Sequence, residues 1–290
     1  MKWTSAFFVA AGLLIIAGIA PQRAVAADAA CPPAQLATKY TSLAGKTIKV
    51  GTDPETPPYT MRDPANFDHL IGFDTELAEA TFKCIGAPIS FEVGSWSGQL
   101  PAVANGKTDI MWDTLYYTPE RAQQMDFVIY FTAATGGLVA KGNPKKITSL
   151  DLGSVCGIRA AAALGSVEEK KFHDISDQCT AAGKKPIEIF VAADLTAGYR
   201  AIINDRADLY LINFGAASQM IAQNPDKLEM GFKINTDIKV GVGVNKQEKE
   251  LAQAIIDGLT AIRADGTEEA IYKKYNIDYS LALPIALLSE

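Results

Sequence analysis

Side chains suited to binding a small acid follow two strand-like stretches of the sequence. Trp96 comes after one alternating stretch, and Asp113 and Thr114 come directly after a short apolar run. Arg121 follows a few residues later. Ligands in open α/β sheets gather outside the carboxyl ends of the strands, so we expect these side chains to converge on one crevice. An arginine and an aromatic ring in a crevice are suited to a small carboxylate.

Arg121 is the first candidate for contact with a ligand. Its planar guanidinium matches a carboxylate through two parallel hydrogen bonds. It follows Thr118 and Pro119, which are typical of the N-cap and first position of a short helix. The alternative is a solvated helix arginine paired with Glu120 or Asp126.

The segment that holds these residues resembles the first lobe of a known family. This family comprises the periplasmic solute-binding proteins of ABC transporters, family 3, which bind polar amino acids. The shared pattern is an aromatic residue, then Gly, Pro-Ala, Gly-Lys-x-Asp, Thr-x-x-Arg and Asp-Phe. The residues that match it are Trp96, Gly98, Pro101, Ala102, Gly106, Lys107, Asp109, Thr118, Arg121, Asp126 and Phe127. The resemblance runs from about Gly45 to Tyr275.

A βαβ succession in the first half of the chain predicts a parallel sheet. The expected elements are strands at 47–51, 89–93 and 109–112, a helix from Asp74 and a helix at 98–104. The proline-rich segment 52–60 is expected to be irregular.

The second half repeats this organisation, because a polar turn leads into a buried strand in both halves. The expected strands are 155–158, 187–191 and 209–213, and the expected helices are 166–182, 195–203, 215–223, 247–263 and 268–275. The stretches 136–141 and 239–244 are interpreted as paired crossover strands. Two similar lobes facing one cleft would follow.

The resemblance implies an α/β fold of the two-lobe, type II periplasmic-binding-protein kind. Each lobe is expected to hold a mixed, mostly parallel sheet flanked by helices, and two crossover strands are expected to join the lobes. The predicted organisation is a signal peptide at 1–26, the first part of lobe 1 at 27–140, lobe 2 at 141–238, and a return to lobe 1 with a C-terminal tail at 239–290.

The signal peptide is predicted from Lys2, an apolar run at 6–20 and small residues at Ala24 and Ala26. It indicates export to the periplasm. No later stretch has the ~18 apolar residues that a membrane span requires. The net charge of −6 argues against nucleic acid as a partner. A metal site is not expected, because His69 and His173 are the only histidines and no Cys-x-x-Cys unit occurs.

Four cysteines follow the predicted cleavage point, in a compartment where disulfides persist. They are Cys31, Cys84, Cys156 and Cys179. Sequence alone allows three pairings. The predicted lobe boundaries favour Cys31 with Cys84 and Cys156 with Cys179, because each pair then stays within one lobe.

Two tyrosines are further candidates for the site. Tyr59 could stack over the ligand, as could Trp96, or cap a cationic group, although core packing is the commoner fate of aromatic residues. Tyr116 stands where members of the family often have a small hydroxyl residue or glycine. It would therefore narrow or reshape the pocket.

Three polar residues have both a functional and a structural interpretation. Asp113 could accept a hydrogen bond from a ligand ammonium group or cap the helix near Thr118. Asp53 could meet the ligand or a water, or shape the turn before Pro54. Related chains usually have small residues at positions 113 and 114 whose backbone and hydroxyl groups meet the ligand, which implies the same contact for Thr114.

Asn213 and Ser166 mark departures from the family pattern. Family members typically have an aspartate at the strand end occupied by Asn213, and it neutralises the ligand α-ammonium group. Asparagine brings no charge, so either Asp113 or Asp53 supplies it, or the ligand is not a standard α-amino acid. Ser166 follows a run of alanines where the family has Gly-Thr-Thr. It serves a carboxylate only if the loop is slightly longer, whereas the backbone amides of the following helix remain.

The resemblance implies a binding protein rather than an enzyme. We expect it to capture a small carboxylate-bearing polar solute, an amino acid or derivative, and to deliver it to an ABC permease. We expect a monomer without a cofactor. One alternative is an enzyme resembling the cyclohexadienyl dehydratases, with Asp113 as the candidate acid or base. Another is an accessory protein of a periplasmic oxidoreductase.

Overall fold

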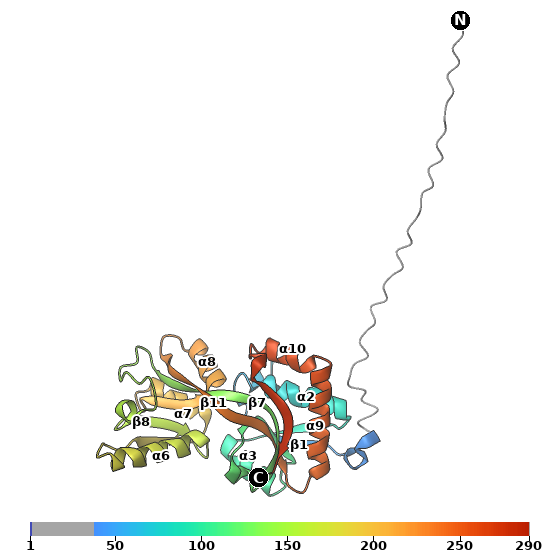
Figure 1. Ribbon diagram of the computed structural model, residues 1–290, viewed down its shortest axis with the longest axis horizontal. Coiled ribbons are helices and arrows are strands. Elements are labelled where there is room, and N and C mark those ends of the chain that lie inside the picture. Colours follow the sequence, from blue (N-terminus) through green and yellow to red (C-terminus); the bar gives the residue numbers. More distant parts are fainter. Residues whose placement is uncertain (2–37, 290) are drawn as a thin grey trace.

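Two α/β lobes lie side by side in this protein (Figure 1). The computed structural model describes Met1 and residues 38–289. The predicted signal peptide and Cys31 lie outside the described ranges. Strands β7 (Met125–Ala140) and β11 (Leu228–Asn245) run from one lobe into the other.

The first lobe is built on strand β1 (Ile48–Thr52), which pairs in parallel with β5 (Ile89–Val93) and β6 (Ile110–Tyr116). Its helices are α2 (Phe73–Ile85), α3 (Trp96–Ala104), α4 (Pro119–Ala122), α9 (Lys249–Ala264) and α10 (Thr267–Lys274). The predicted parallel βαβ arrangement is therefore confirmed in this lobe. Because β1 and β6 are parallel neighbours, their carboxyl ends lie at the same edge of the sheet, which places the residues after them together.

The second lobe repeats the arrangement around strand β8 (Arg159–Ala163). This strand is parallel to β9 (Glu188–Ala192) and β10 (Leu209–Asn213). The helices are α5 (Leu152–Val155), α6 (Val167–Ala181), α7 (Leu195–Ile203) and α8 (Phe214–Gln223). The positions of α6, α7 and α8 match the predicted helices to within a residue at most of their ends.

The prediction of a strand at 155–158 is wrong. Val155 ends helix α5, and Gly157 takes a left-handed conformation with φ +80°. The strand begins only at Arg159 and consists mainly of alanines that are buried. Alanine is a weak strand former, and a parallel strand covered on both faces shows no alternation, so the pattern did not reveal it.

The central sheet is continuous through both lobes, in the order β5-β1-β6-β11-β7-β10-β8-β9. Strand β11 is antiparallel to β6 and β7, and β7 is antiparallel to β10. The crossover strands are longer than the predicted stretches 136–141 and 239–244 but include them. The segment predicted as a C-terminal tail contains strand β12 (Ala282–Leu288), which pairs with β7.

A small separate sheet lies near the amino-terminal part of lobe 1. It contains β2 (Glu55–Thr56), β3 (Thr60–Asp63) and β4 (Asn66–Ile71). The segment 52–60, predicted to be irregular, therefore includes one short strand and the start of another. Its residues 53–54 and 57–59, the latter around the cis Pro57-Pro58 bond, lie outside the strands.

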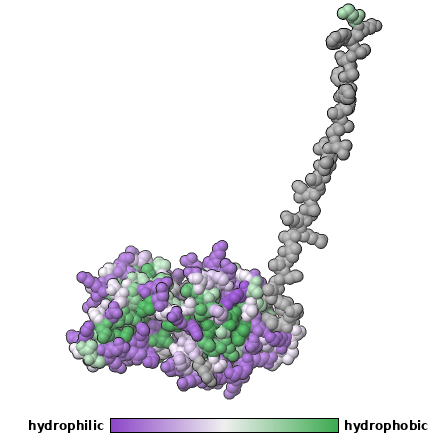
Figure 2. Space-filling view, viewed as in Figure 1, coloured by the Kyte–Doolittle hydropathy of each residue, from purple (hydrophilic) through white to green (hydrophobic). Residues whose placement is uncertain are grey.

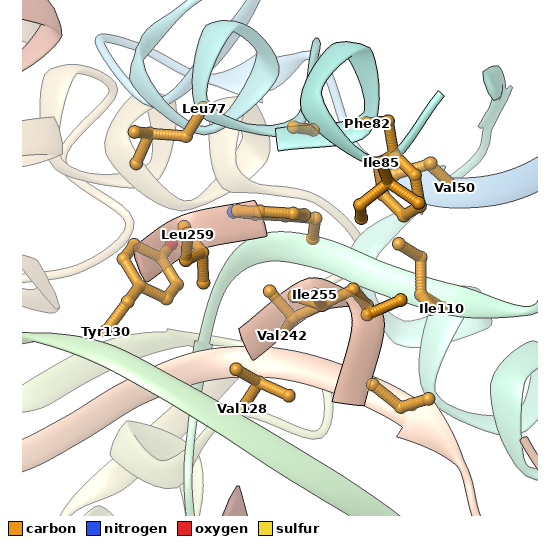
Figure 3. Packing of buried hydrophobic residues seen from close by; sticks show 14 of the residues in the cluster. Val50, Leu77, Phe82, Ile85, Ile110, Val128, Tyr130, Val242, Ile255 and Leu259 are labelled. Carbon is orange, nitrogen blue, oxygen red and sulfur yellow. The ribbon is translucent and has the colours of Figure 1, made fainter. Parts of the chain in front are cut away.

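The core of lobe 1 lies between helices α2 and α9 and the central sheet (Figure 3). Leu77, Phe82 and Ile85 come from α2, and Ile255 and Leu259 come from α9. They meet sheet residues that include Val50, Ile110, Val128, Tyr130 and Val242. On the face seen in Figure 2, hydrophobic residues show in both lobes with polar residues around them. Along the described part of the chain, no helix is both long and apolar enough to cross a membrane.

A disulfide joins Cys156 and Cys179 in lobe 2, as the lobe boundaries predicted. It ties the segment before β8 to helix α6. Cys84 is disulfide-bonded as well. Its predicted partner, Cys31, lies outside the described residues.

The Cys156–Cys179 bond should contribute measurably to stability. It closes a loop with a sequence separation of 23 residues, for which loss of chain entropy in the unfolded state corresponds to about 3 kcal/mol. We expect the double variant Cys156→Ser, Cys179→Ser to lose that much in urea unfolding followed by circular dichroism. The exposed neighbour variant Gln178→Ser should change stability by less than about 0.5 kcal/mol. An unchanged unfolding midpoint in the double variant would contradict this expectation.

Candidate functional site

A cavity of about 60 Å³ lies between the two lobes. Its walls combine one guanidinium, two carboxyl groups, several hydroxyl groups and apolar side chains. The lining residues from lobe 1 are Thr56, Tyr59, Trp96, Asp113, Thr114, Tyr116 and Arg121. Those from lobe 2 are Ala163, Ser166, Val167, Glu168, Leu195, Tyr210, Leu211, Ile212, Asn213 and Ala216. A small polar ligand here would touch both lobes.

Arg121 lies in the wall of this cavity and contacts both lobes. Its Nη1 donates to the carbonyl oxygen of Tyr116 at 2.7 Å, and its Nη2 donates to the carbonyl oxygen of Gly165 in lobe 2 at 3.1 Å. The guanidinium also stacks on the Trp96 ring, 5.0 Å from its centroid. Thr118 caps the short helix α4 by accepting from the Arg121 N–H, as predicted. Burial lowers the pKa of Arg121 to about 10, so the side chain stays charged at neutral pH.

The charge of Arg121 is only partly matched by the protein. Among the described residues, no acid forms an ion pair with it within 4.0 Å. Its side-chain hydrogen bonds to Tyr116 and Gly165 use two of the five N–H donors of a guanidinium. The remaining donors are available to an anion in the cavity.

Asp113 is fully buried and its two oxygens are already engaged. Oδ1 accepts from the Thr56 hydroxyl at 2.8 Å, and Oδ2 accepts from the Asp53 N–H at 3.0 Å. Burial, and after it the charge of Asp53, raises the pKa of Asp113 well above its usual range. The carboxyl group therefore joins the first loop to the end of β6.

Asp53 is not one of the described residues that line the cavity. Its Oδ1 accepts from the Glu55 N–H at 3.1 Å, and its Oδ2 accepts from the Trp96 N–H at 2.8 Å. Of the two interpretations offered for Asp53, the structure thus supports shaping of the loop. Through the second bond it fixes the start of helix α3 and the position of Trp96.

Thr114 is held in place by Asp74, the buried acid in the first turn of α2. Asp74 accepts from the Thr114 hydroxyl at 2.7 Å and from its backbone N–H, and it also accepts from the Tyr130 hydroxyl. Thr114 has a φ of 47°, a left-handed conformation that is uncommon for a threonine. The Asp74 carboxylate therefore stabilises the strained strand end from which Asp113, Thr114 and Tyr116 reach the site.

Asn213 caps helix α8 at the lobe 2 side of the cavity. Its Oδ1 accepts from the Gly215 N–H at 2.8 Å and the Ala216 N–H at 3.4 Å. The Tyr59 hydroxyl of lobe 1 donates to the same oxygen at 2.8 Å. Gly215 is required for this approach, because a Cβ there would lie 2.4 Å from the Tyr59 hydroxyl. The Tyr59 side chain therefore forms a hydrogen bond between the two lobes, a role that the sequence did not predict for it.

Ser166 begins helix α6, and its role is structural in part. Its hydroxyl accepts from the Glu169 N–H at 3.1 Å, while the Glu169 carboxylate accepts from the Gly165 N–H at 2.6 Å. These reciprocal bonds form a variant of the capping box in which the glutamate accepts from the residue before the N-cap rather than from the N-cap itself. The helix N-terminus that they stabilise faces the cavity.

Sequence reasoning missed Glu168 and Tyr210. Glu168 is buried at the second position of α6, and burial raises the pKa of its carboxyl group. Tyr210 is fully buried in β10. Glu168 could have been proposed from the sequence, because it lies two residues after the N-cap Ser166, and the side chain of such an acid can point into a cleft. Tyr210 gave no signal, since an aromatic residue within a strand usually packs in the core.

Tyr116, Tyr210 and Asn213 line the cavity, and each has a buried polar side-chain atom. Within the described part of the protein, the hydroxyls of both tyrosines and Nδ2 of Asn213 have no hydrogen-bond partner. All three side chains are at least nine-tenths buried. Buried polar groups are rarely left unpaired, so these atoms mark a site for a polar molecule.

The comparisons with known proteins agree with this architecture. Residues 48–278 match the family of bacterial extracellular solute-binding proteins, family 3. The chain therefore belongs to that family. A probable histidine-binding protein of Campylobacter jejuni is 28% identical over 237 residues, which cover 80% of this chain and 86% of that protein. The lysine/arginine/ornithine-binding periplasmic protein of Escherichia coli is 25% identical over 248 residues, covering 82% of this chain and 90% of that protein.

Solved structures show the same fold. An ancestral arginine-binding protein bound to glutamine is 28% identical with a TM-score of 0.70, covering 79% of this chain and 97% of that chain. The ancestral amino acid-binding protein AncCDT-1, a precursor of cyclohexadienyl dehydratase, is 25% identical with a TM-score of 0.68 and covers 82% and 98% respectively. The predicted fold class is confirmed.

Asp74 gives the site region a specific pH dependence. Burial raises its pKa from 3.8 to about 6. The folded state then binds this proton more tightly than the unfolded state, so the contribution of Asp74 is most favourable at low pH and declines as the pH rises to about 6. Relative to Asp74→Asn, the wild-type free energy of unfolding should fall by about 3 kcal/mol between about pH 4 and about pH 7. Urea titrations across this range would measure it, and a difference that rises with pH would contradict it.

Proposed function

We propose that this protein is a periplasmic receptor that captures a small carboxylate-bearing polar solute in the interlobe cavity and delivers it to an ABC permease. The solute is an amino acid or a derivative of one. The family and its named relatives, which include histidine-binding and arginine-binding proteins, support capture of a compound of this class. The predicted signal peptide supports export to the periplasm, and the permease is the partner implied by the family.

The observation that carries the proposal is the position of Arg121. Its guanidinium is partly buried at the cavity, stacked on Trp96, and lies within reach of the N-terminus of α6. A ligand carboxylate there would receive charged hydrogen bonds from the guanidinium, which are roughly twice as strong as neutral ones. It would also lie in the favourable field of the helix N-terminus.

The proposed ligand would favour closure because its contacts come from both lobes. The present contacts across the cavity are few: the bonds of Arg121 to Gly165 and of Tyr59 to Asn213, and a longer bond from the Thr196 N–H to Glu55 at 3.4 Å. A ligand shifts a hinge equilibrium only by its difference in affinity for the two states. Strands β7 and β11 are the continuous elements about which such a hinge motion would occur.

Removal of the Arg121 guanidinium should abolish this recognition. In a thermal-shift screen of amino acids, organic acids and opines, we expect at least one carboxylate to raise the melting temperature of the wild type. Arg121→Ala should eliminate that shift, with a loss of affinity of at least about a hundredfold. Arg200→Ala removes an exposed arginine from α7 and should preserve the shift. If Arg121→Ala binds the same carboxylate as tightly as the wild type does, the proposal is wrong.

Buried carboxyl groups in the cavity favour a test for catalysis as well. Asp113 and Glu168 both have raised pKa values through burial, which is a property of acid and base catalysts. The hydrogen bonds of Asp113 and the position of Glu168 near Arg121 explain why these carboxyl groups are buried here, without a catalytic role. We therefore expect prephenate and arogenate to remain intact in the presence of the protein. Chromatography after a long incubation would measure this, and turnover that Asp113→Asn abolishes would replace receptor function with enzymatic function.

A further inference from the structure

The amide of Asn213 has a fixed orientation in this structure. Backbone N–H groups can only donate, and the Gly215 N–H lies 2.8 Å from Oδ1. Tyr59 adds a second donor at 2.8 Å to the same oxygen. Oδ1 is therefore committed to the helix cap and to lobe 1, and the other end of the amide is the NH₂ group.

This orientation makes the cavity face of Asn213 a donor. Nδ2 is buried and makes no hydrogen bond of good geometry among the residues that the structure describes, although the Tyr116 hydroxyl lies close enough to interact with the Asn213 amide. Asn213 lines the cavity with only 8% of its surface exposed. An ammonium group carries donors and no lone pair, so it cannot satisfy an NH₂ group. A hydroxyl or carbonyl oxygen can.

The other acids near the cavity offer little to an ammonium group. Both oxygens of Asp113 and both oxygens of Asp53 already accept hydrogen bonds from the protein. Glu168 has Arg121 as a nearby positive charge, and the Tyr116 and Tyr210 hydroxyls lie in its field. Arg121 and Glu168 therefore offset each other's charge in part, although they form no ion pair within 4.0 Å among the described residues.

We infer that the ligand presents a hydrogen-bond acceptor, not an ammonium group, to Asn213. This inference rests on the proposed function, because it assumes that Arg121 holds a carboxylate. The ligand class is then a small carboxylate with a hydroxyl or oxo oxygen on the adjacent carbon. The hydroxyls of Tyr116 and Tyr210, which can both donate and accept, complete a neutral polar lining for such an oxygen.

A change of Asn213 to aspartate would reverse this selection. Aspartate caps a helix about as well as asparagine, so the fold of α8 should be retained. One carboxylate oxygen would accept from Gly215, and the other would replace Nδ2 at the cavity. The same position would then accept from an ammonium group.

The test compares acids that differ in one group. Calorimetry would measure wild-type affinity for L-alanine against L-lactate, L-valine against L-2-hydroxyisovalerate, L-glutamate against L-2-hydroxyglutarate and L-phenylalanine against L-phenyllactate. In every pair that binds, we expect the hydroxy acid to bind at least about tenfold more tightly, because the amino acid leaves a buried donor unpaired. Asn213→Asp should shift this ratio by at least about tenfold toward the amino acid.

Two further variants make the result specific. Asn105→Asp adds the same charge at an exposed position in lobe 1 and should leave the wild-type ratio unchanged. Glu168→Gln should also preserve the preference for the hydroxy acid. A wild type that prefers the amino acid, with the preference lost in Glu168→Gln, would identify Glu168 as the ammonium acceptor and overturn the inference.

The inference about Asn213 and the proposed function can be contradicted separately. Equal or tighter binding of the amino acid, or a ratio that Asn213→Asp leaves unchanged, would overturn the inference while carboxylate recognition stands. If no member of any pair binds, and no other carboxylate in the thermal-shift screen does, the proposed function itself is wrong and the inference falls with it.

Discussion

The site depends on one partly buried positive charge that the protein does not fully neutralise. The guanidinium of Arg121 lies between the lobes, on the Trp96 ring, and donates to one backbone carbonyl oxygen from each lobe. Burying a charge is costly unless it is paired and hydrogen-bonded. Neutral carbonyl groups and the field of Glu168, which makes no ion pair with Arg121 within 4.0 Å among the described residues, meet only part of that requirement. In the proposed function, an anion in the cavity would meet the rest, and this would link ligand capture to lobe closure.

The surrounding polar residues mostly position this charge and shape the space in front of it. Asp113 and Asp53 connect the first loop, strand β6 and helix α3. Asp74 stabilises the strained backbone at Thr114. Three acids close to the cleft therefore serve to hold its walls, whereas Arg121 and the unpaired donors of Asn213, Tyr116 and Tyr210 face the ligand space. Rigidity of the walls lowers the entropic cost of binding.

Much of the fold could be predicted because its signals are local. Helix α7, for example, has an aspartate cap and a strongly amphipathic pattern, and its bounds were predicted to the residue. The alanine strand β8 could not be predicted, since its burial is decided by helices on both faces and not by its own side chains. The lengths of β7 and β11 were underestimated for a related reason: their pairing joins residues far apart in the sequence, from Leu228 with Ala140 to Asn245 with Met125. The lobe boundaries in the sequence remain a prediction.

The candidate site was predictable where a motif spans it and obscure where only three-dimensional packing defines it. Thr118 and Arg121 belong to one short motif, and the structure places Arg121 at the cavity. For Asp53 the sequence left ligand contact and turn shaping equally open, and its hydrogen bonds in the structure are to Glu55 and Trp96. Glu168 was overlooked because acids in the first turn of a helix are common on surfaces. The orientation of the Asn213 amide could not be read at all without the backbone N–H groups that fix it.

The most direct test of this account is a crystal structure of the protein with the carboxylate that stabilises it most. The account predicts a carboxylate oxygen about 3 Å from a guanidinium nitrogen of Arg121, inside the cavity, with both lobes in contact with the ligand. A ligand bound elsewhere, or one whose carboxylate points to solvent while Arg121 keeps only its bonds to Tyr116 and Gly165, would contradict it.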